Sequence, residues 1–272
     1  MNASIQCLLQ SRLIIERLGS ITNLDTIKSE ERGMYWHFSK FLQQYHTNKY
    51  QMLLLPTFLF QSLLTNCRDF KVGRQYDAVD FLTELLDALE TSGTCSNYFR
   101  IAMTSTLRCK ECSFESSQNE TDSILRLPLG NTLSEAMSLF FNKEDISDVY
   151  CSRCKVNRVQ EKTTSLSSTS EILIIQQKLF DRFLNKVKSR LSFPLDDFEP
   201  AASTGVYELF GIINHIGDYD SGHYVSMVKD METNKWYKCS DSNVNPTSNN
   251  VIFQSPNNYV LFYSRKNKYV YF

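Results

Sequence analysis

The sequence predicts an α+β protein whose helices and strands lie in separate parts of the chain. Over the first ~95 residues, apolar side chains recur at helical spacing. From residue ~98 onward, short runs rich in β-branched and aromatic residues replace them, separated by turn-forming residues. No repeat at a fixed period is present, and helices do not alternate with strands. Segregation of this kind is typical of α+β proteins rather than of parallel βαβ architectures.

Three helices are expected in the N-terminal part. An apolar stripe that includes Ile5 and Leu18 predicts the first, and Gly19 is a suitable C-terminal stop. The second is a less regular aromatic segment, GMYWHFSKFLQQYH. The third is QYDAVDFLTELLDALE, in which the apolar residues share one face and acidic residues crowd the first turns.

Strands are expected in two stretches of the chain. The first begins with FRIAMTSTLRCKECSFESS, contains one short helix in LSEAMSLFF, and is expected to break at SLSSTS, residues 165–170. The second begins at Tyr207 and contains the runs YELFGIIN, HYVSMVK, KWYKCS and NYVLFYSR. The turns GDYDSG and DMETN between these runs predict an antiparallel sheet.

Composition excludes several classes of function. The chain is 42% hydrophobic, and its 29 basic and 30 acidic residues give a formal charge of −1, so no attraction to nucleic acid or to an anionic membrane is indicated. The apolar runs are far shorter than the ~20 residues that a membrane span needs, and the N-terminus lacks the layout of a signal peptide. We expect an intracellular monomer in the cytoplasm, the nucleus or both.

Two C-x-x-C pairs predict a structural zinc site. Cys109 and Cys112 form one pair, and Cys151 and Cys154 form the other. Each spacing lets two thiolates face one ion, and two pairs complete a tetrahedral shell of four sulfurs, which zinc prefers. No position stays open for a substrate, so the metal would stabilise the fold and not catalyse. The remaining cysteines are expected to be small core residues: Cys7, Cys67, Cys95 and Cys239.

A second group of residues suggests acid–base chemistry. His223 lies between the turn DYDSG and a strand, and Ser240 and Asp241 end the next expected strand. Antiparallel neighbours would bring these positions together. A histidine oriented by a short polar side chain is the general-base half of a nucleophilic site. Taken alone, a histidine in a glycine-rich turn is more commonly structural.

The chain as a whole resembles the ubiquitin-specific proteases, a family of deubiquitinases. The resemblance runs through nearly the whole chain in ordered boxes: MNASIQCLLQ, GRQYDAVDFLTELLDAL, the two C-x-x-C pairs, ILIIQQKLF, YELFGIINHIGDYDSGHYVSMVK, KWYKCSDSNV and NYVLFYSR. It implies one papain-like cysteine peptidase domain over residues 1–272. A helical thumb would occupy residues 1–97, zinc-braced β fingers and the start of the palm 98–200, and an antiparallel palm sheet 201–272. The fingers would grip ubiquitin, and its tail would thread between thumb and palm.

The resemblance also implies roles for single residues. His223 matches the catalytic histidine that activates a cysteine nucleophile. Gln75 and Asp77 match the Q-x-D-A box, whose aspartate is expected to pair with arginines in the tail of ubiquitin through charge-assisted hydrogen bonds. Asp77 is also suited to cap a helix, and both roles are compatible. His215 and Tyr224 match residues that line the tail channel.

Some positions depart from the family pattern. Ser240 stands where the family commonly has Asp or Asn, and a hydroxyl brings no charge to stabilise an imidazolium, so neighbouring Asp241 is expected to contribute more than usual. In the family, the box that corresponds to ILIIQQKLF usually ends in L-K-R-F. Here Leu179 stands in place of the arginine, although Lys178 and Phe180 are kept. We expect this strand to be structural.

The nucleophile is the largest departure. The family box N-x-G-N-T-C-Y-M-N aligns its last two letters with Met1 and Asn2, so the catalytic cysteine would precede Met1, together with the oxyanion-hole donors. Cys7 aligns with a later cysteine of the box. It lies about two turns into the expected helix among apolar neighbours, where the helix N-terminus cannot activate it, so we expect an inert core thiol.

Three functions are compatible with these features to different degrees. The first is a ubiquitin hydrolase in a form that includes the cysteine, in which case the chain as written is inactive. The second is a pseudoenzyme that binds ubiquitin without cleaving it. The third, a nucleic-acid-binding zinc ribbon, is disfavoured by the near-neutral charge and the lack of a clustered basic face.

Overall fold

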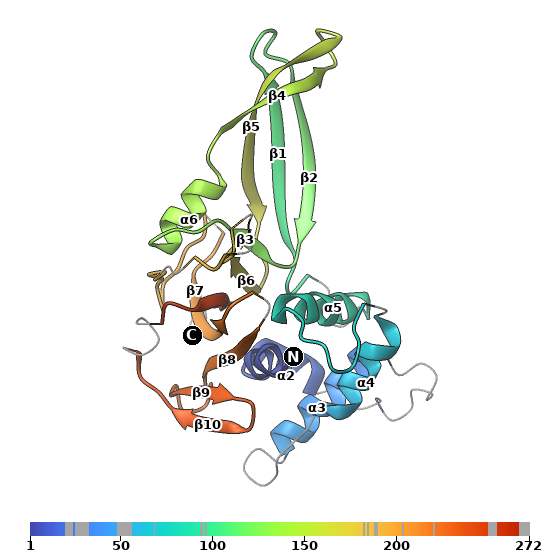
Figure 1. The fold of residues 1–272 in the computed structure, drawn as a ribbon, viewed down its shortest axis with the longest axis vertical. Helices are drawn as coiled ribbons and strands as arrows, with labels where there is room; N and C mark the ends of the chain where they lie inside the picture. Colours follow the sequence, from blue (N-terminus) through green and yellow to red (C-terminus); the bar gives the residue numbers. More distant parts are fainter. Residues whose placement is uncertain are drawn as a thin grey trace, which may run out of the picture.

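The molecule is an elongated α+β structure with two β-sheets. The computed structural model describes residues 1–19, 24, 33–47, 56–67, 69–92, 95, 97–181, 183, 185–187, 190–202, 204–219, 221–249 and 255–266. Figure 1 shows a long four-stranded sheet that projects from a body, in which the helices of the N-terminal part lie on one side and a seven-stranded sheet, with one further short helix beside it, on the other. The predicted α+β class is confirmed.

The helices precede the sheets along the chain, apart from one short helix. Their bounds are α1 Asn2–Leu8, α2 Arg12–Gly19, α3 Met34–Thr47, α4 Thr57–Asn66, α5 Ala78–Thr91 and α6 Leu133–Phe140. Asp77 caps α5 by accepting a hydrogen bond from the Val79 amide at 2.7 Å, as its sequence position predicts. Helix α4 was not identified from the sequence.

The prediction of one continuous helix across Ile5 to Leu18 is wrong. The chain forms α1 and α2 with a break between them, where the amide of Ser11 bonds the carbonyl of Leu8 at 3.1 Å. The Ser11 hydroxyl accepts a hydrogen bond from the Ile14 amide at 3.4 Å. A serine in this position competes with the helical hydrogen-bond pattern and starts a new helix instead.

The seven-stranded sheet forms the core of the body. Its strand order is β10-β9-β8-β7-β11-β6-β3. The strands are β3 Leu125–Leu127, β6 Ile172–Gln177, β7 Tyr207–Gly217, β8 Gly222–Lys229, β9 Trp236–Ser240, β10 Asn243–Pro246 and β11 Asn258–Arg265. The neighbours are antiparallel as predicted, except that β3 pairs with β6 in parallel. We call this sheet the palm sheet.

The four-stranded sheet is the projecting arm of Figure 1. It has the order β2-β1-β5-β4 and is antiparallel throughout, and we call it the fingers sheet. Its strands are β1 Ile101–Cys109, β2 Glu115–Asp122, β4 Glu144–Cys151 and β5 Val156–Ser168. The expected break at residues 165–170 is wrong for its first part, because Ser165 to Ser168 continue β5 and pair with β1. Small hydroxyl side chains fit a two-sided solvated sheet.

The elements that carry the predicted site are held together by the main hydrophobic core. Helix α1 packs against the palm strands β7 and β8 and against α5, with Ile5, Cys7 and Leu8 almost fully buried. The exact partition into residues 1–97, 98–200 and 201–272 stays a prediction. Within the part of the chain described by the structure, no helix is long and apolar enough to cross a membrane.

Candidate active site

His223 and Ser240 lie side by side on neighbouring palm strands. Strands β8 and β9 pair antiparallel with Ser226 opposite Cys239, so the start of β8 comes close to the end of β9. The His223 Nε2 atom lies 2.8 Å from the Ser240 hydroxyl oxygen. The predicted juxtaposition is therefore present. With Nε2 occupied by the hydroxyl, Nδ1 is the ring nitrogen that can exchange a proton with a nucleophile.

Asp241 makes its hydrogen bonds to helix α1. Its carboxylate accepts from Asn2 Nδ2 at 3.0 Å, and its carbonyl accepts from Gln6 Nε2 at 3.1 Å. The side chain of Gln6 also accepts a 2.5 Å hydrogen bond from the Ser226 hydroxyl. Asp241 thus fixes the start of α1 against the strands that carry His223, while Ser240 contacts the histidine directly.

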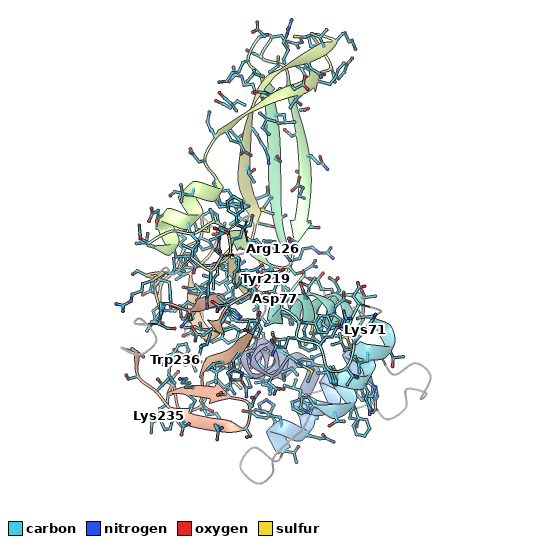
Figure 2. The ribbon with its side chains drawn as sticks, viewed as in Figure 1. Lys71, Asp77, Arg126, Tyr219, Lys235 and Trp236 are labelled. Atoms are coloured by element: carbon cyan, nitrogen blue, oxygen red, sulfur yellow. The ribbon has the colours of Figure 1, made fainter. Side chains whose placement is uncertain are left out.

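A cavity of about 840 Å³ connects these residues with the start of α5. Its walls include the predicted Gln75, Asp77, His215, Tyr224 and His223. Met1, Asn2 and Asp241 also lie on its wall, but no cysteine does among the described residues. Sequence reasoning missed other lining residues, among them Arg126, Tyr219 and Tyr259, and Figure 2 places the labels of Asp77, Arg126 and Tyr219 close together at the foot of the fingers sheet.

Asp77 is held by two elements at once. One carboxylate oxygen caps α5, and the other accepts a 2.7 Å hydrogen bond from the Tyr259 hydroxyl of β11. Tyr259 in turn accepts from Gln176 Nε2 at 2.7 Å. Burial raises the pKa of the Tyr224 and Tyr259 hydroxyls, and the nearby Asp77 charge raises it further. Both tyrosines therefore stay neutral hydrogen-bond donors beside the carboxylate.

His215 is buried among aromatic rings beside the cavity. Its ring centroid lies 5.5 Å from that of Phe180, 4.9 Å from Tyr224 and 6.3 Å from Tyr259. Its Nδ1 atom has no hydrogen-bond partner among the described residues. Gly222 makes room for the ring, since a Cβ there would lie 2.0 Å from His215 Nε2. The ring is therefore held by packing against its aromatic neighbours.

Lys186 fixes the end of β7 next to His215. Its ammonium donates to the main-chain carbonyl of His215, to that of Gly217 at 3.1 Å and to Asn257 Oδ1 at 3.1 Å. Burial lowers the pKa of His215, and the positive charge of Lys186 lowers it further. The imidazole is therefore kept neutral near pH 7.

Cys7 is a core thiol, as predicted. It is 0% exposed, and its sulfur lies 3.7 Å from the carbonyl oxygen of Ile212, to which it donates. Burial raises its pKa well above the ordinary value. A buried, protonated thiol is a poor nucleophile.

The four predicted zinc ligands lie together where two turns of the fingers sheet meet. The sulfur of Cys109 is 4.0 Å from that of Cys154, the sulfur of Cys112 is 3.5 Å from that of Cys151, and all four lie within 4.8 Å of one another. The Cys154 amide donates to the Cys151 sulfur at 3.5 Å. This bond, followed by contacts with the Arg153 amide and with the Cys112 and Cys109 thiols, lowers the pKa of Cys151 to about 6. The cluster can hold a metal ion.

Comparison with known proteins agrees with this arrangement. Residues 1–263 match the family described as Ubiquitin carboxyl-terminal hydrolase. The chain belongs to this family. A relative from Arabidopsis thaliana, Ubiquitin carboxyl-terminal hydrolase 25, is 32% identical over 233 residues, which cover 73% of this chain and 35% of the relative. Ubiquitin carboxyl-terminal hydrolase Usp2 of Drosophila melanogaster is 24% identical, covering 97% and 34% respectively. The chain thus spans about a third of the length of these two hydrolases.

Solved structures show the same fold. The structure of the SAGA Ubp8/Sgf11/Sus1/Sgf73 DUB module bound to ubiquitin aldehyde contains a chain with a TM-score of 0.81 and 20% identity to this hydrolase-family chain, and the match covers 98% of this chain and 67% of that one. A second structure of that module, bound to monoubiquitin, gives a TM-score of 0.81 and 21% identity, and the match covers 98% of this chain and 66% of that one. The architecture is that of the catalytic domain of ubiquitin-specific proteases.

Proposed function

We propose that this chain is the ubiquitin-recognising domain of a thiol-dependent deubiquitinase, which hydrolyses the isopeptide bond at the C-terminus of ubiquitin. The observation that carries the proposal is that His223, Asp77 and the start of α1 all border one cavity, and that His223 is hydrogen-bonded to Ser240 behind it. A cationic extended tail can enter at Asp77 and reach His223. Two of the solved neighbours were studied with ubiquitin or its aldehyde.

In this proposal the residues divide into recognition and proton transfer. Asp77, whose position is fixed by Tyr259 and by the α5 amide, accepts hydrogen bonds from a guanidinium of the tail. Gln75, His215 and Tyr224 line the path of the tail. His223 takes a proton from the thiol and later returns it to the leaving amine, while Ser240 holds Nε2 and so selects the tautomer.

In this proposal the thiol is supplied by a cysteine placed before Met1. Met1 and Asn2 lie on the wall of the cavity that also contains His223, so a residue placed before them is within the same region. The alternative function is ubiquitin binding without cleavage. It is favoured by the absence of a cysteine among the described lining residues and by the burial of Cys7.

We also propose that the fingers sheet binds zinc. Four thiolates at about 2.3 Å from one tetrahedral ion lie about 3.8 Å from each other, and the sulfur distances of 3.5 and 4.0 Å across the cluster fit this spacing. The ion would contribute to folding and leave no open position for substrate. We also propose a reducing, intracellular location in the cytoplasm or nucleus, which the free state of all eight cysteines supports. A monomeric state is part of the proposal as well.

The decisive experiment compares two polypeptides. One is the 272-residue chain, and the other carries the family's Gly-Asn-Thr-Cys-Tyr ahead of Met1. Release of a fluorogenic leaving group from a ubiquitin conjugate is expected only for the extended chain, and it should disappear when the added cysteine becomes alanine or when His223→Ala is introduced. Turnover by the unextended chain that is lost in Cys7→Ala would contradict the assignment of the nucleophile.

Binding separates the two candidate functions. Both polypeptides are expected to bind monoubiquitin, and Asp77→Asn should weaken this binding because the tail guanidinium loses a charged partner. If the extended chain binds ubiquitin but never turns over, the binding function without cleavage is the correct one. If neither polypeptide binds ubiquitin, both functions are wrong for this chain.

A further inference from the structure

The fingers sheet meets the palm sheet through a short linker. Strand β5 of the fingers ends at Ser168, and β6 of the palm begins at Ile172, so only three residues join the two sheets here. These residues are Thr169, Ser170 and Glu171. Any rotation of the fingers about the palm has to change the backbone of this linker.

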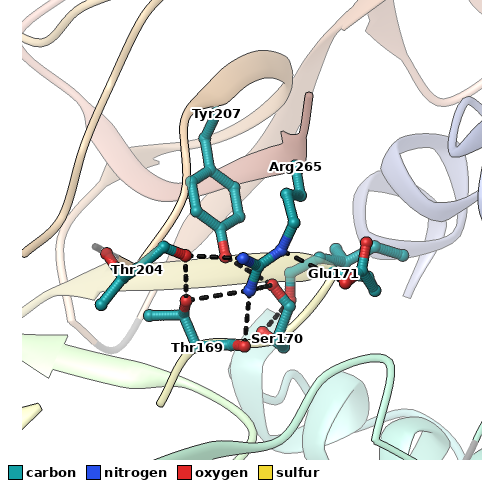
Figure 3. A network of polar contacts seen from close by, with 7 residues as sticks. Thr169, Ser170, Glu171, Thr204, Tyr207 and Arg265 are labelled. Carbon is teal, nitrogen blue, oxygen red and sulfur yellow. Dashed lines mark hydrogen bonds and ion pairs between the residues drawn. The ribbon is translucent and has the colours of Figure 1, made fainter. Parts of the chain in front are cut away.

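Arg265, the last residue of β11, binds all three linker residues (Figure 3). Its Nη2 atom donates to the Thr169 carbonyl at 2.7 Å, to the Thr169 hydroxyl at 3.0 Å and to the Ser170 carbonyl at 3.2 Å. Its Nε atom lies 3.2 Å from the carboxylate of Glu171, and its own amide donates to the Glu171 carbonyl at 2.8 Å. One side chain therefore fixes the linker along its whole length.

The same guanidinium also reaches the segment that leads into β7. Its Nη1 atom donates to the Thr204 carbonyl at 2.6 Å, and its carbon lies 5.2 Å from the centroid of the Tyr207 ring. The hydroxyl of Tyr207, which is fully buried, donates to the Ser170 carbonyl at 2.5 Å. Arg265 and Tyr207 thus approach the linker from neighbouring palm strands, as Figure 3 shows.

The surroundings of the guanidinium are shaped for it. Gly205 has a φ of +102°, and a Cβ at this position would lie 2.5 Å from Arg265 Nη1. A lysine could not reproduce the contacts, because an ammonium lacks the planar fork that lets one arginine reach Thr169, Glu171 and Thr204 at once. Loss of the guanidinium would also leave the Ser170 and Thr204 carbonyls without this donor.

The opposite corner of the fingers sheet is attached differently. Arg100, just before β1, pairs with Glu90 of α5 at 3.1 Å, and its side chain is 51% exposed. The Ser123 hydroxyl, just after β2, donates to the same glutamate at 3.4 Å. Only the arginine end of this pair is open to solvent, since Glu90 is 11% exposed. A further ion pair joins Arg126 of β3 to Asp122 of β2. The Arg265 corner differs from both because one guanidinium binds the linker at several points.

We propose that Arg265 is a positioning residue that sets the angle of the fingers sheet relative to the cavity. The inference rests on the proposed function: ubiquitin is held by its globular body on the fingers and by its tail in the cavity, and a correct angle lets both contacts form together. Two linked contacts reinforce each other only when the geometry allows both. Arg265 contacts neither the cavity nor His223, so it acts on recognition through the orientation of the sheet.

The angle can be measured without any ligand. Genetically encoded, non-cysteine spin labels at Ser116 of β2 and Lys238 of β9, both exposed, report the distance between fingers and palm. Arg265→Met and Arg265→Lys are expected to broaden or shift this distance distribution, and Arg100→Met is the matched control that should leave it unchanged. Gly205→Ala, which displaces the guanidinium without removing it, should act in the same direction and serves if the Arg265 variants fail to fold. An unchanged distribution in all folded variants would overturn the proposal.

Binding then tests the consequence for recognition. In Arg265→Lys or Gly205→Ala, affinity for whole ubiquitin should fall by roughly tenfold or more, since simultaneous engagement is lost, whereas affinity for a peptide of the ubiquitin tail should stay within about twofold. Equal losses for ubiquitin and peptide, or no loss for either, would contradict the positioning role. If the unmodified chain binds no ubiquitin, the proposed function fails, and the label distances alone still decide whether Arg265 fixes the sheet.

Discussion

The two sheets of this molecule are stabilised in different ways. In the palm sheet, β6 and β11 are buried along nearly their whole length, and β7 is buried from Leu209 to His215. In the fingers sheet, β2 is exposed from Glu115 to Thr121, and most of β5 is exposed or half-buried. Hydrophobic burial therefore holds the palm, while the fingers have to rely on other interactions.

Those other interactions are polar pairs and the cysteine cluster. Across the fingers strands, Thr104 donates to Asn119 at 3.0 Å, and the hydroxyls of Thr106 and Ser117 lie 2.9 Å apart. Such cross-strand pairs contribute roughly 0.2–1 kcal/mol each. The difference teaches that the sheet carrying His223 is held by packing, whereas the sheet proposed to hold the body of ubiquitin has to rely on the metal proposed for its cysteine cluster and on its attachment to the palm.

Removal of the metal should have the largest effect and should separate the two sheets. A chelator, or Cys112→Ser, is expected to unfold the fingers while the palm stays folded, because structural zinc sites contribute about 10–16 kcal/mol of binding free energy in small domains. Hydrogen exchange measures this directly: amides of β1, β2, β4 and β5 should lose protection, and those of β7 and β11 should keep it. Cys67→Ser, outside the cluster, is the control. Equal loss of protection in both sheets would show that they are one cooperative unit.

The same substitution, leucine to alanine, can be made at one position in each sheet and its effects on stability compared. Leu173 in β6 is 0% exposed, whereas Leu107 in β1 is half-buried. Leu173→Ala is expected to lower the free energy of unfolding by about 3 kcal/mol, because it leaves a cavity in a packed core, and Leu107→Ala by about 1 kcal/mol or less. Urea unfolding, monitored by hydrogen exchange at the amides of each sheet, gives both changes in the free energy of unfolding. A larger effect at Leu107 would mean that the fingers have a hydrophobic core of their own.

Loss of one hydroxyl should have an intermediate effect at the cavity. Tyr259→Phe removes the donor to the half-buried carboxylate of Asp77 and should cost about 1.5–3 kcal/mol, the range for hydrogen bonds to charged groups. Tyr237→Phe, at a half-buried tyrosine of β9, is the control. Thermal unfolding monitored by circular dichroism checks the pair. Equal effects would show that Asp77 is held in place by the α5 cap alone.

Much of the fold could be predicted from local patterns. The strands of the palm were evident because β-branched and aromatic runs alternate with turn residues, and the metal cluster because C-x-x-C spacing is a local signal. Helix α5 was equally clear from its apolar face and from its cap at Asp77. The break between α1 and α2 was missed because it depends on one serine, Ser11, whose hydroxyl competes with the helix.

The contacts of the site were harder to predict, since they join residues far apart in sequence. Tyr259 meets Asp77 because the register of β11 against β7 shifts between Asn258 and Val260, and a bulge of this kind re-aims a side chain. Nothing in the run NYVLFYSR indicates the bulge. In the same way, the choice between Ser240 and Asp241 as the partner of His223 depends on the turn after β9, where Asp241 has a φ of +50°.

A smaller, pH-dependent effect should appear in the palm. The pKa of His215 is lowered from its ordinary value of 6.5, chiefly by burial. Below about pH 6.5 the unfolded state therefore binds more protons than the folded state, and stability falls as the pH drops toward the lowered pKa, with no further loss from this group below it. The slope of the free energy of unfolding between about pH 8 and about pH 5.5 should be shallower in His215→Gln than in the unmodified chain. Identical slopes would mean that the folded histidine is free to protonate.

Charge pairs on the fingers should have the smallest effect. Arg108 and Glu115 face each other across β1 and β2 at 3.7 Å, with both side chains more than half exposed. Arg108→Gln is expected to change stability by about 0–1 kcal/mol, and the change should shrink further at high salt. Urea midpoints at low and high ionic strength test both points. A loss of unfolding free energy above about 2 kcal/mol would mean that charge interactions, and not the metal, are the main stabilisation of the fingers sheet, because isolated exposed pairs do not reach that value.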